Sequence, residues 1–377
     1  MHQETLFVHN GTYHDSATRG VNTPIFTSSS FEYLDRENCP YPRYFNTPNQ
    51  DTVVRKMSSL EEGQDGVLFS SGMAAMSTTV LAFAGSGDHV VLLDELYGGT
   101  HAFATDTFDR LGIRYSFAAT DAYAVIQAST QATKVIIIES PTNPLLGIID
   151  IRSIAEFARS RGITTIIDNT FATPVNQRPL SLGIDVVVHS GTKYLGGHSD
   201  ICCGIAITSH EYADRIRAMA RHLGGSLNAI TCYLLERSLK TLAIRVERQT
   251  QNAHRIAEFL DSHNFVTKVN YPGLPNFRGH DVARSQMTGF GGMLSFELSE
   301  NRVSTKAFLR RLRMIRPAVS LGGVESIICA PSETSHVKIS SEERRRIGIS
   351  DSLLRPSVGI EHEDDIIEDI SQALNER

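Results

Sequence analysis

Ile184–Gly197, with the sequence IDVVVHSGTKYLGG, is the stretch from which the fold of the chain is most directly inferred. Its first residues, IDVVV, are mainly apolar and β-branched, which predicts a buried strand. The strand ends in a polar turn that leads to Lys193 and then to two glycines. A lysine beside hydroxyls and a glycine at a strand end can hold an aldehyde cofactor covalently next to a phosphate-binding turn. Taken alone, Lys193 is equally well explained as a surface residue in a loop.

Composition and charge restrict the class of protein. The chain has 377 residues, of which 41% are hydrophobic and 21% charged, and this length suits about two or three globular domains. The net charge of −6 is small for this length, so neither nucleic acid nor an anionic membrane is an expected partner. No apolar run approaches the ~20 residues of a membrane helix. The N-terminus lacks a basic segment followed by an apolar one, so we predict a cytoplasmic protein.

The cysteines give no sign of a metal site. There are five of them: Cys39, Cys202, Cys203, Cys232 and Cys329. Their spacing matches no metal-binding pattern, so no metal is expected. Cys202 and Cys203 lie in the apolar run ICCGIAI, which favours buried, inert thiols over a catalytic one.

The hydrophobic pattern divides the chain into three parts. Residues 1–50 combine helix-breaking prolines with many aromatic residues, a composition too aromatic for disorder, so we expect an arm packed on a neighbouring subunit. Residues 51–240 alternate helical patterns with short apolar strands, which predicts an α/β domain with a mostly parallel sheet. Residues 241–377 favour a smaller α+β domain, with the boundary placed inside or after a long helical stretch.

Four loops at predicted strand ends have compositions that suit a single ligand. Ser70–Met76, SSGMAAM, opens a helix whose N–H groups can contact an anion, although a serine there is also an ordinary helix cap. Tyr97 in YGGTH can lie flat on an aromatic ring or be a simple turn residue. Asn143 in ESPTNP offers a donor and an acceptor, but Asn-Pro is also common in turns. Asp168 in IIDNT can hold a proton on a pyridine nitrogen or cap a helix.

Together these loops resemble the Cys/Met-metabolism family of pyridoxal 5′-phosphate (PLP) enzymes. The motifs, in the family's order, are SSGM, YGGT, ESPTNP, DNTFATP, HSGTKYLGGHSD, SLGGVES and RPSVGIE. The family includes cystathionine γ-synthase, cystathionine γ-lyase, cystathionine β-lyase and methionine γ-lyase, and the resemblance extends from about Glu4 to the C-terminus. It implies an aminotransferase-like fold of type I and a homotetramer, built as a dimer of dimers with shared active sites.

The resemblance also implies roles for individual residues at the cofactor. Lys193 would link to PLP covalently, Asp168 would keep the pyridine nitrogen protonated, and Tyr97 would stack on the ring. Asn143 would bond to the ring hydroxyl. The phosphate would be held by the backbone of Gly72 and Met73, by the hydroxyls of Ser190 and Thr192, and by Tyr41 and Arg43 of a neighbouring subunit.

Further residues are implied for the substrate. Arg355 matches the arginine that binds the α-carboxylate in a bidentate manner, and the backbone at Ser320 and Leu321 would orient Lys193 and the substrate. Lys193 would remove the α-proton and then transfer protons between carbon atoms as acid and base. Tyr97 is the candidate acid for the leaving group. Loss of a γ-substituent, followed by water or a thiol, gives a lyase or a synthase.

Departures from the family pattern bear on the substrate's distal end. Tyr44 stands where a small or basic residue is usual. Ala102 replaces the arginine that many γ-synthases and γ-lyases use for a distal carboxylate, and methionine γ-lyases, which share this alanine, have a cysteine in place of Gly99. Glu333 adds a negative charge in the segment PSETSH. Glu325 in GGVES fits the γ-synthase and γ-lyase branch, where a glutamate meets a distal amino group.

These signals conflict about the exact reaction. They favour a PLP-dependent C–S lyase or γ-replacement enzyme of the cystathionine γ-lyase or γ-synthase type, acting in cysteine and methionine metabolism. One alternative is a methionine γ-lyase-like or lineage-specific enzyme whose γ-substituted substrate is not a dicarboxylate; another is cystathionine β-lyase. A non-enzymatic binding protein on the same fold is a further alternative, against which the retained Lys193, Asp168 and Arg355 argue.

Overall fold

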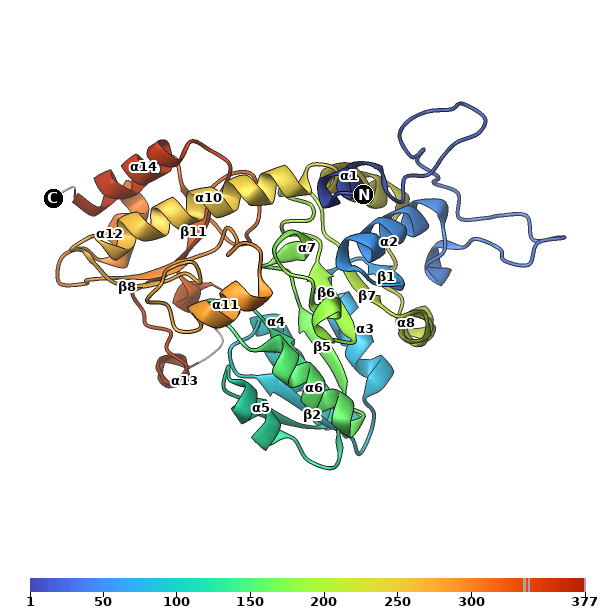
Figure 1. Ribbon diagram of the computed structural model, residues 1–377, viewed down its shortest axis with the longest axis horizontal. Coiled ribbons are helices and arrows are strands. Elements are labelled where there is room, and N and C mark those ends of the chain that lie inside the picture. Colours follow the sequence, from blue (N-terminus) through green and yellow to red (C-terminus); the bar gives the residue numbers. More distant parts are fainter. Residues whose placement is uncertain (335–336, 338–339, 376–377) are drawn as a thin grey trace.

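Two β-sheets organise residues 1–334, 337 and 340–375, which are the residues that the computed structural model describes. Figure 1 shows the larger sheet near the centre of the molecule and the smaller one toward the C-terminus. The long helix α10 runs from one to the other.

The larger sheet has seven strands within the described residues, in the order β1-β7-β6-β5-β4-β2-β3. In chain order they are β1 Asp65–Phe69, β2 His89–Leu93, β3 Arg114–Ala118, β4 Thr133–Glu139, β5 Thr164–Asp168, β6 Val186–Ser190 and β7 Gly204–Thr208. Of these strands, only β7 runs opposite to the other six, so the predicted mostly parallel sheet is confirmed. The central strands are apolar and buried because helices cover both faces of the sheet.

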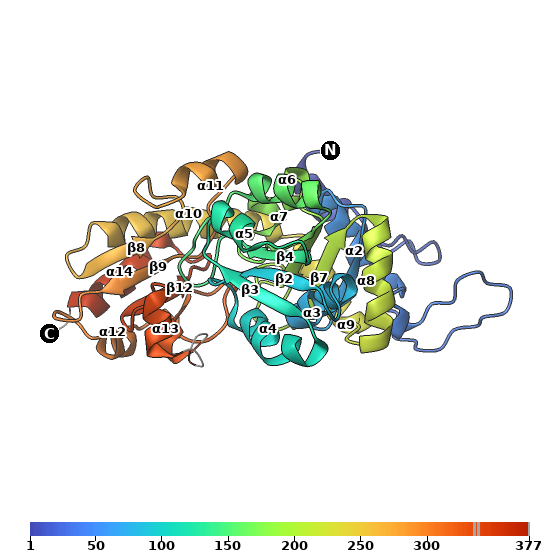
Figure 2. The same cartoon turned by 90° about the horizontal axis from the view of Figure 1, so that it is seen from below.

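Helices α3 and α4 lie on one face of this sheet, and α5 and α6 lie on the other (Figure 2). The α-helices that precede α10 in the described residues are α1 Gln3–His9, α2 Pro48–Glu61, α3 Gly72–Phe83, α4 Gly98–Leu111, α5 Ala122–Ala128, α6 Ile151–Arg161, α7 Thr173–Asn176, α8 His210–Leu223 and α9 Ala229–Leu239. Helices α4 and α6 stop at Gly112 and Gly162, which adopt the left-handed conformation that terminates helices.

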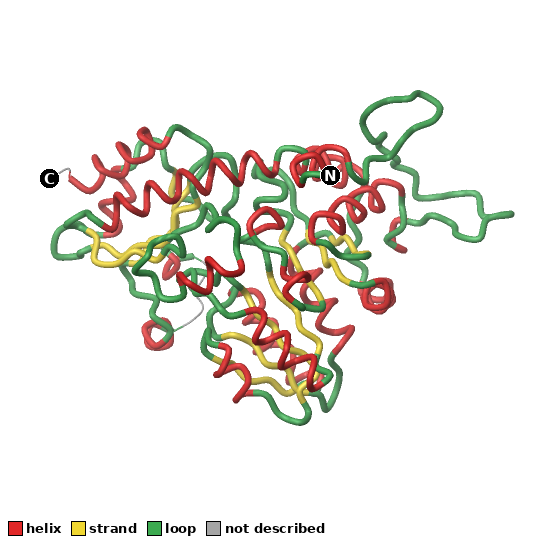
Figure 3. Tube along the Cα trace, in the orientation of Figure 1, coloured by secondary structure: helices red, strands yellow, loops and turns green. Residues whose placement is uncertain are grey.

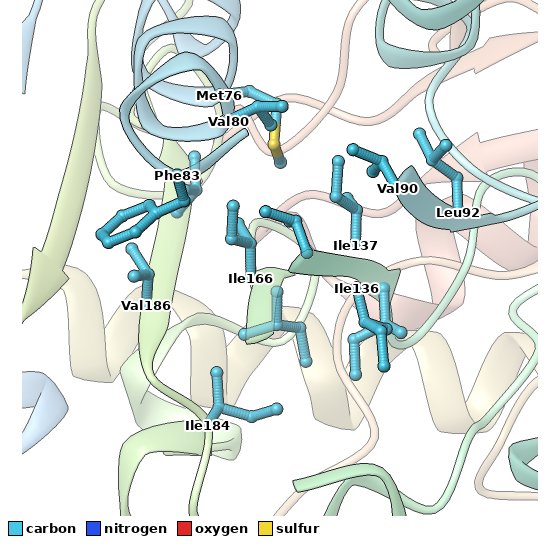
Figure 4. Packing of buried hydrophobic residues seen from close by; sticks show 14 of the residues in the cluster. Met76, Val80, Phe83, Val90, Leu92, Ile136, Ile137, Ile166, Ile184 and Val186 are labelled. Atoms are coloured by element: carbon cyan, nitrogen blue, oxygen red, sulfur yellow. The ribbon is translucent and has the colours of Figure 1, made fainter. Parts of the chain in front are cut away.

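The main hydrophobic core lies between the large sheet and these helices. Met76, Val80 and Phe83 of α3 belong to the same buried cluster as the strand residues Ile137 and Ile166. Figure 4 shows the α3 side chains directed toward the sheet. Because this packing fixes α3 against the strands, the first turn of α3 is held beside the end of β6.

The smaller sheet is formed by residues that follow α10 and is mostly antiparallel. Its strand order is β10-β11-β12-β9-β8, with β10 paired parallel to β11. The elements are β8 Val266–Asn270, α11 His280–Gln286, β9 Ser295–Leu298, α12 Thr305–Arg311, β10 Arg316–Pro317, β11 Ile327–Cys329, the short 3₁₀ helix η3 Pro331–Glu333, α13 Ser341–Arg346, β12 Leu353–Ser357 and α14 Glu363–Asn375. A second core joins this sheet to α10, α12 and α14.

Helix α10, Leu242–Asp261, connects the two regions. Its 20 residues correspond to a length of about 30 Å. It contacts α1, α7 and α9 on the side of the large sheet, and β8 and α14 on the side of the smaller one.

The N-terminal region has little regular structure after α1. Residues 10–41, all of them described, contain neither helix nor strand and extend away from the body of the chain (Figure 3). Three of its apolar side chains are largely exposed, namely Val21 at 90%, Tyr33 at 71% and Leu34 at 72%. Contact of this arm with a neighbouring subunit stays a prediction.

Candidate active site

A cavity of about 540 Å³ lies at the carboxyl ends of the parallel strands, where it also meets the C-terminal region. Of the predicted site residues, its lining includes Gly72, Met73, Tyr97, Asn143, Asp168, Ser190, Thr192, Lys193, Ser320, Leu321 and Arg355. Residues that are far apart in the sequence meet here because the ends of parallel strands share one edge of the sheet.

Lys193 lies in the turn after β6, half-buried in the cavity. Its Nζ donates a hydrogen bond to Ser320 Oγ over 2.8 Å. Burial lowers the pKa of the Lys193 ammonium, and the positive charge of Arg355 lowers it further. Both effects favour the neutral amine, which is the form that can accept a proton.

Asp168 ends β5 and is held by Thr170. The carboxylate Oδ1 of Asp168 accepts hydrogen bonds from Thr170 N at 3.0 Å and from Thr170 Oγ1 at 2.5 Å. Thr170 Oγ1 in turn accepts one from Ser190 N at 2.8 Å. Burial raises the pKa of Asp168, and the bonds from Thr170 oppose this rise. A cationic ring nitrogen next to this carboxylate would compensate for its burial.

Glu139, which sequence reasoning did not single out, is a second carboxyl group of the cavity. It ends β4 and is paired in register with Asp168 on β5. Its Oε2 accepts a hydrogen bond from Tyr97 N over 2.9 Å, which fixes the start of α4. Burial raises the pKa of Glu139 well above its ordinary value, and the charge of Asp168 adds to the rise. Two buried carboxyl groups this close resist carrying two negative charges.

Tyr97 is the residue before α4 and remains 44% exposed at the cavity. Its ring lies so close to Gly99 that a Cβ added there would overlap the ring, and it would also lie 3.1 Å from Met73 Sδ. The position of the tyrosine therefore depends on the glycine two residues later.

The first turn of α3 forms an anion-binding corner with the end of β6. Ser71 caps α3 by accepting a hydrogen bond from Ala74 N. A Cβ on Gly72 would lie 2.8 Å from Ser190 Cβ, so only glycine fits between these segments. Free N–H groups and the helix dipole favour an anion here. The Thr192 hydroxyl lines the same corner and bonds to the backbone of Cys203.

Arg355 of β12 crosses from the C-terminal region into the cavity and is 4% exposed. Its Nη1 donates to Asn143 Oδ1 over 2.6 Å, and its Nη2 donates to Ser320 O over 3.2 Å. Within the described part of the chain, its buried Nε has no hydrogen-bond partner. A buried guanidinium with a free donor is suited to a carboxylate ligand.

Tyr41 and Arg43 do not join this cavity. They flank the start of the 3₁₀ helix η1, Pro42–Tyr44, and both are exposed. Arg43 Nη1 donates to Arg221 O over 2.9 Å, and its guanidinium lies 5.4 Å from the centre of the Tyr44 ring. Within one chain, these two predicted phosphate ligands are separate from the others.

Of the residues predicted to affect the distal end of the substrate, some line the cavity and others do not. Glu333 lines the cavity, and its carboxylate lies 3.8 Å from Lys306 Nζ. Ser335 and His336 of the same segment lie outside the described residues. Glu325 is exposed and accepts a hydrogen bond from Ser199 Oγ. Among the lining residues that the structure describes, neither Glu325 nor Ala102 is found.

The prediction that Cys202 is a buried core residue is wrong. Cys203 is fully buried, but Cys202 is exposed and lines the cavity. Both cysteines belong to the loop before β7, which begins at Gly204, but Cys203 packs into the hydrophobic core whereas Cys202 lines the cavity. The described residues contain no helix that could span a membrane. They also contain no group of acidic, histidine or cysteine side chains suited to a metal ion.

Comparison with known proteins agrees with this geometry. A sequence model of the family described as "Cys/Met metabolism PLP-dependent enzyme" matches residues 4–375. The chain is 43% identical over 380 residues to a cystathionine gamma-lyase of Bacillus subtilis (strain 168), covering 99% of both chains. It is 40% identical over 377 residues to a cystathionine gamma-synthase of Mycobacterium leprae (strain TN), covering 98% of this chain and 96% of that one.

A solved structure has nearly the same fold. The crystal structure of cystathionine gamma-lyase from Lactobacillus plantarum complexed with L-serine superposes with a TM-score of 0.95 and is 38% identical, covering 99% of this chain and 98% of that one. The predicted fold class and the predicted dependence on PLP are thereby confirmed. The chain belongs to the family of PLP-dependent enzymes of cysteine and methionine metabolism.

Proposed function

We propose that this enzyme cleaves or forms a carbon–sulfur bond at a γ-substituted amino acid, as a cystathionine γ-lyase or γ-synthase does. The observation that carries the proposal is the meeting of Lys193, Asp168 and Arg355 in one cavity. They supply a base, a partner for a ring cation and a carboxylate clamp. Similarity to a cystathionine gamma-lyase and a cystathionine gamma-synthase over nearly the whole chain supports the same reaction class.

The residues around the cavity fit PLP. The corner at Gly72 and Ser190 suits the phosphate, since the first turn of α3 approaches Ser190 so closely there that a Cβ at position 72 would overlap it. Met73 and Thr192 line the same cavity, as does Asp168, whose carboxylate would hold a proton on the ring nitrogen. PLP, when bound, supplies the electron sink for charge that develops at the substrate's α-carbon.

Lys193 is the proposed base. Its lowered pKa favours a neutral amine, which removes the α-proton of the substrate. The hydrogen bond to Ser320 Oγ holds the Lys193 amine at the cavity, and the same amine can return the proton to another carbon atom. Tyr97 at the cavity is the proposed acid for the leaving group, and its ring is also available to stack on the cofactor.

Arg355 is the proposed site for the substrate's α-carboxylate. Its buried Nε has no hydrogen-bond partner among the residues that the structure describes, and Asn143 and Ser320 O hold the other end of the guanidinium. A bidentate contact with a carboxylate would fix the α-carbon near Lys193.

The N-terminal arm is proposed to complete the site of a neighbouring subunit. Tyr41 and Arg43 are exposed and lie outside their own chain's cavity lining, and the arm exposes apolar side chains that a partner would cover. A dimer of dimers with shared sites accounts for both observations. We further propose residues 1–50, 51–240 and 241–377 as arm, cofactor domain and C-terminal domain.

One experiment tests the proposed reaction. The purified holoenzyme is given cystathionine, O-succinylhomoserine, O-acetylhomoserine or methionine, each with and without cysteine, and the products are identified. We expect cystathionine to be consumed or formed. If cystathionine is neither consumed nor formed while a smaller, neutral-tailed substrate reacts, the methionine γ-lyase-like alternative replaces this proposal.

Replacing Gly72 with alanine is expected to weaken PLP binding by about tenfold, because the added methyl group meets Ser190. Equilibrium dialysis of PLP against the apoenzyme measures the change. Gly85→Ala is the matched control, since the nearest atom to its Cβ would be 3.9 Å away. Equal PLP affinity of the two variants would contradict the proposal that this corner binds the phosphate of PLP.

Replacing Glu333 with glutamine is expected to raise KM for cystathionine about threefold, since an exposed carboxylate at the cavity attracts the distal amino group only weakly. Lys306→Gln is the opposite control, because it frees Glu333 from its cationic neighbour and should lower KM. Steady-state kinetics at constant ionic strength measure both. An unchanged KM in both variants would exclude Glu333 from substrate selection.

A further inference from the structure

Helix α10 carries three polar side chains that are buried along one face. Arg245 is 4% exposed, and Gln249 and Asn252 are 0% exposed. Their spacing of four and three residues places them on the same side of the helix. This stripe faces the loops of the active site, although none of its members lines the cavity among the described residues.

Arg245 binds the turn that carries Lys193. Its Nη1 donates to Tyr194 O over 2.8 Å, and its Nη2 donates to Leu195 O at 3.5 Å. The guanidinium lies so close to Gly197, whose φ is +68°, that a Cβ there would overlap it. Arg245 therefore binds the backbone directly after the proposed base.

Gln249, one turn further, binds the loop that carries Ser320. Its Nε2 donates to Gly323 O over 2.7 Å. Ser320 has a φ of +82°, in the left-handed region that non-glycine residues adopt at a cost. The fixed end of this loop helps to hold the Ser320 hydroxyl that accepts the Lys193 hydrogen bond.

Asn252, three residues further along α10, binds the segment that follows Arg355. Its Nδ2 donates to Gly359 O over 3.1 Å and to Glu361 O over 2.8 Å. Both carbonyls follow β12, the strand of Arg355. The three side chains of the stripe thus bind three segments, and each segment carries a different proposed site residue.

We propose that Arg245, Gln249 and Asn252 are positioning residues that set Lys193 against Ser320 and Arg355. A helix that only joined two cores would be served by apolar side chains, which need no partners when buried. The stripe instead places a donor opposite each loop, and α10 spans both regions of the molecule. The inference deepens the proposed function, because it rests on the roles given there to these three site residues.

The effect on local structure is tested by hydrogen–deuterium exchange of the holoenzyme. Gln249→Met and Asn252→Leu keep most of the side-chain volume but remove the donor, and Arg245→Lys keeps the charge but loses the planar fork. We expect exchange about tenfold faster in residues 318–325 for Gln249→Met, in 354–362 for Asn252→Leu and in 190–198 for Arg245→Lys. Gln251→Met is the control, since Gln251 lies on α10 and is exposed.

Kinetics distinguish positioning from simple stabilisation. With the best substrate of the panel, Gln249→Met should lower kcat about tenfold, because Ser320 no longer holds Lys193 in place. Asn252→Leu should instead raise KM about tenfold, because the Arg355 segment binds the α-carboxylate less well, with kcat within about twofold.

Two outcomes would overturn the inference. One is exchange that rises uniformly along the chain in every variant, together with equal changes in kcat and KM. The other is exchange in the three segments that matches the Gln251→Met control. If no amino acid of the panel reacts with the unaltered enzyme, the proposed reaction fails, but the segment-specific exchange pattern still decides whether α10 positions these loops.

Discussion

Lys193→Ala is expected to lower turnover by about 10⁴-fold, the upper part of the range for loss of a general acid–base group. In the proposed mechanism, the variant loses both the covalent link to PLP and the amine that moves the α-proton. Turnover of the panel substrate and the absorbance spectrum measure these losses. The unaltered holoenzyme should be yellow and should lose its colour with borohydride, and after such treatment it should be inactive.

Lys193→Arg is the control that keeps a long side chain with a hydrogen-bond donor. Its guanidinium can still donate to Ser320, but it stays protonated and therefore cannot act as a base. This variant should be as inactive as Lys193→Ala, whereas a small primary amine added to Lys193→Ala should restore part of the turnover. Undiminished turnover in either variant would show that a residue other than Lys193 is the base.

Asp168→Asn is expected to lower kcat by about 10³-fold, similar to the loss of a strong electrostatic contact in other active sites. The amide keeps the shape of Asp168 and can still accept hydrogen bonds from Thr170. It cannot carry the negative charge that, in the proposed mechanism, would keep a ring nitrogen of PLP protonated, so the electron sink would be weakened. Kinetics and PLP affinity, measured separately, show whether catalysis or binding is lost.

Thr170→Val is a milder change with which the loss of kcat in Asp168→Asn can be compared. It removes the hydroxyl that bonds to Asp168 but leaves the Thr170 backbone N–H in place. A drop in kcat smaller than that of Asp168→Asn is expected. A normal kcat in Asp168→Asn would contradict the role given to this carboxylate.

The sequence was informative wherever one local pattern determined one position. The turn at Lys193, the Gly72 corner and Asp168 each follow an apolar strand, and parallel strands bring such ends to one edge. Motif order added the family, the fold type and PLP, all of which are confirmed by the comparisons. Arg355, from the other region, was reachable only through the family resemblance, since no local pattern connects it with Lys193.

Other features depend on tertiary structure and left little local signal. β3, RYSFA, lies at the sheet edge and is only partly buried, so its pattern is weak. Glu139 became part of the site only through its register with Asp168. Cys202 was misplaced because an apolar run does not mark where a strand begins. Gln249 and Asn252 are polar residues in a helix, and sequence alone suggests that such residues face water.

Because Gly99 lies in close contact with the Tyr97 ring, the substitutions that position 99 can accept during evolution depend on the position of Tyr97. A cysteine at position 99, as in methionine γ-lyases, cannot be acquired by this chain while the tyrosine keeps its present place. Such a change would have to be preceded or accompanied by a shift of the Tyr97 ring, and Met73, whose Sδ would lie 3.1 Å from the added atom, would have to move slightly as well. Specificity on this loop is therefore epistatic, and grafting a single residue from a relative would transfer a steric conflict rather than a substrate preference.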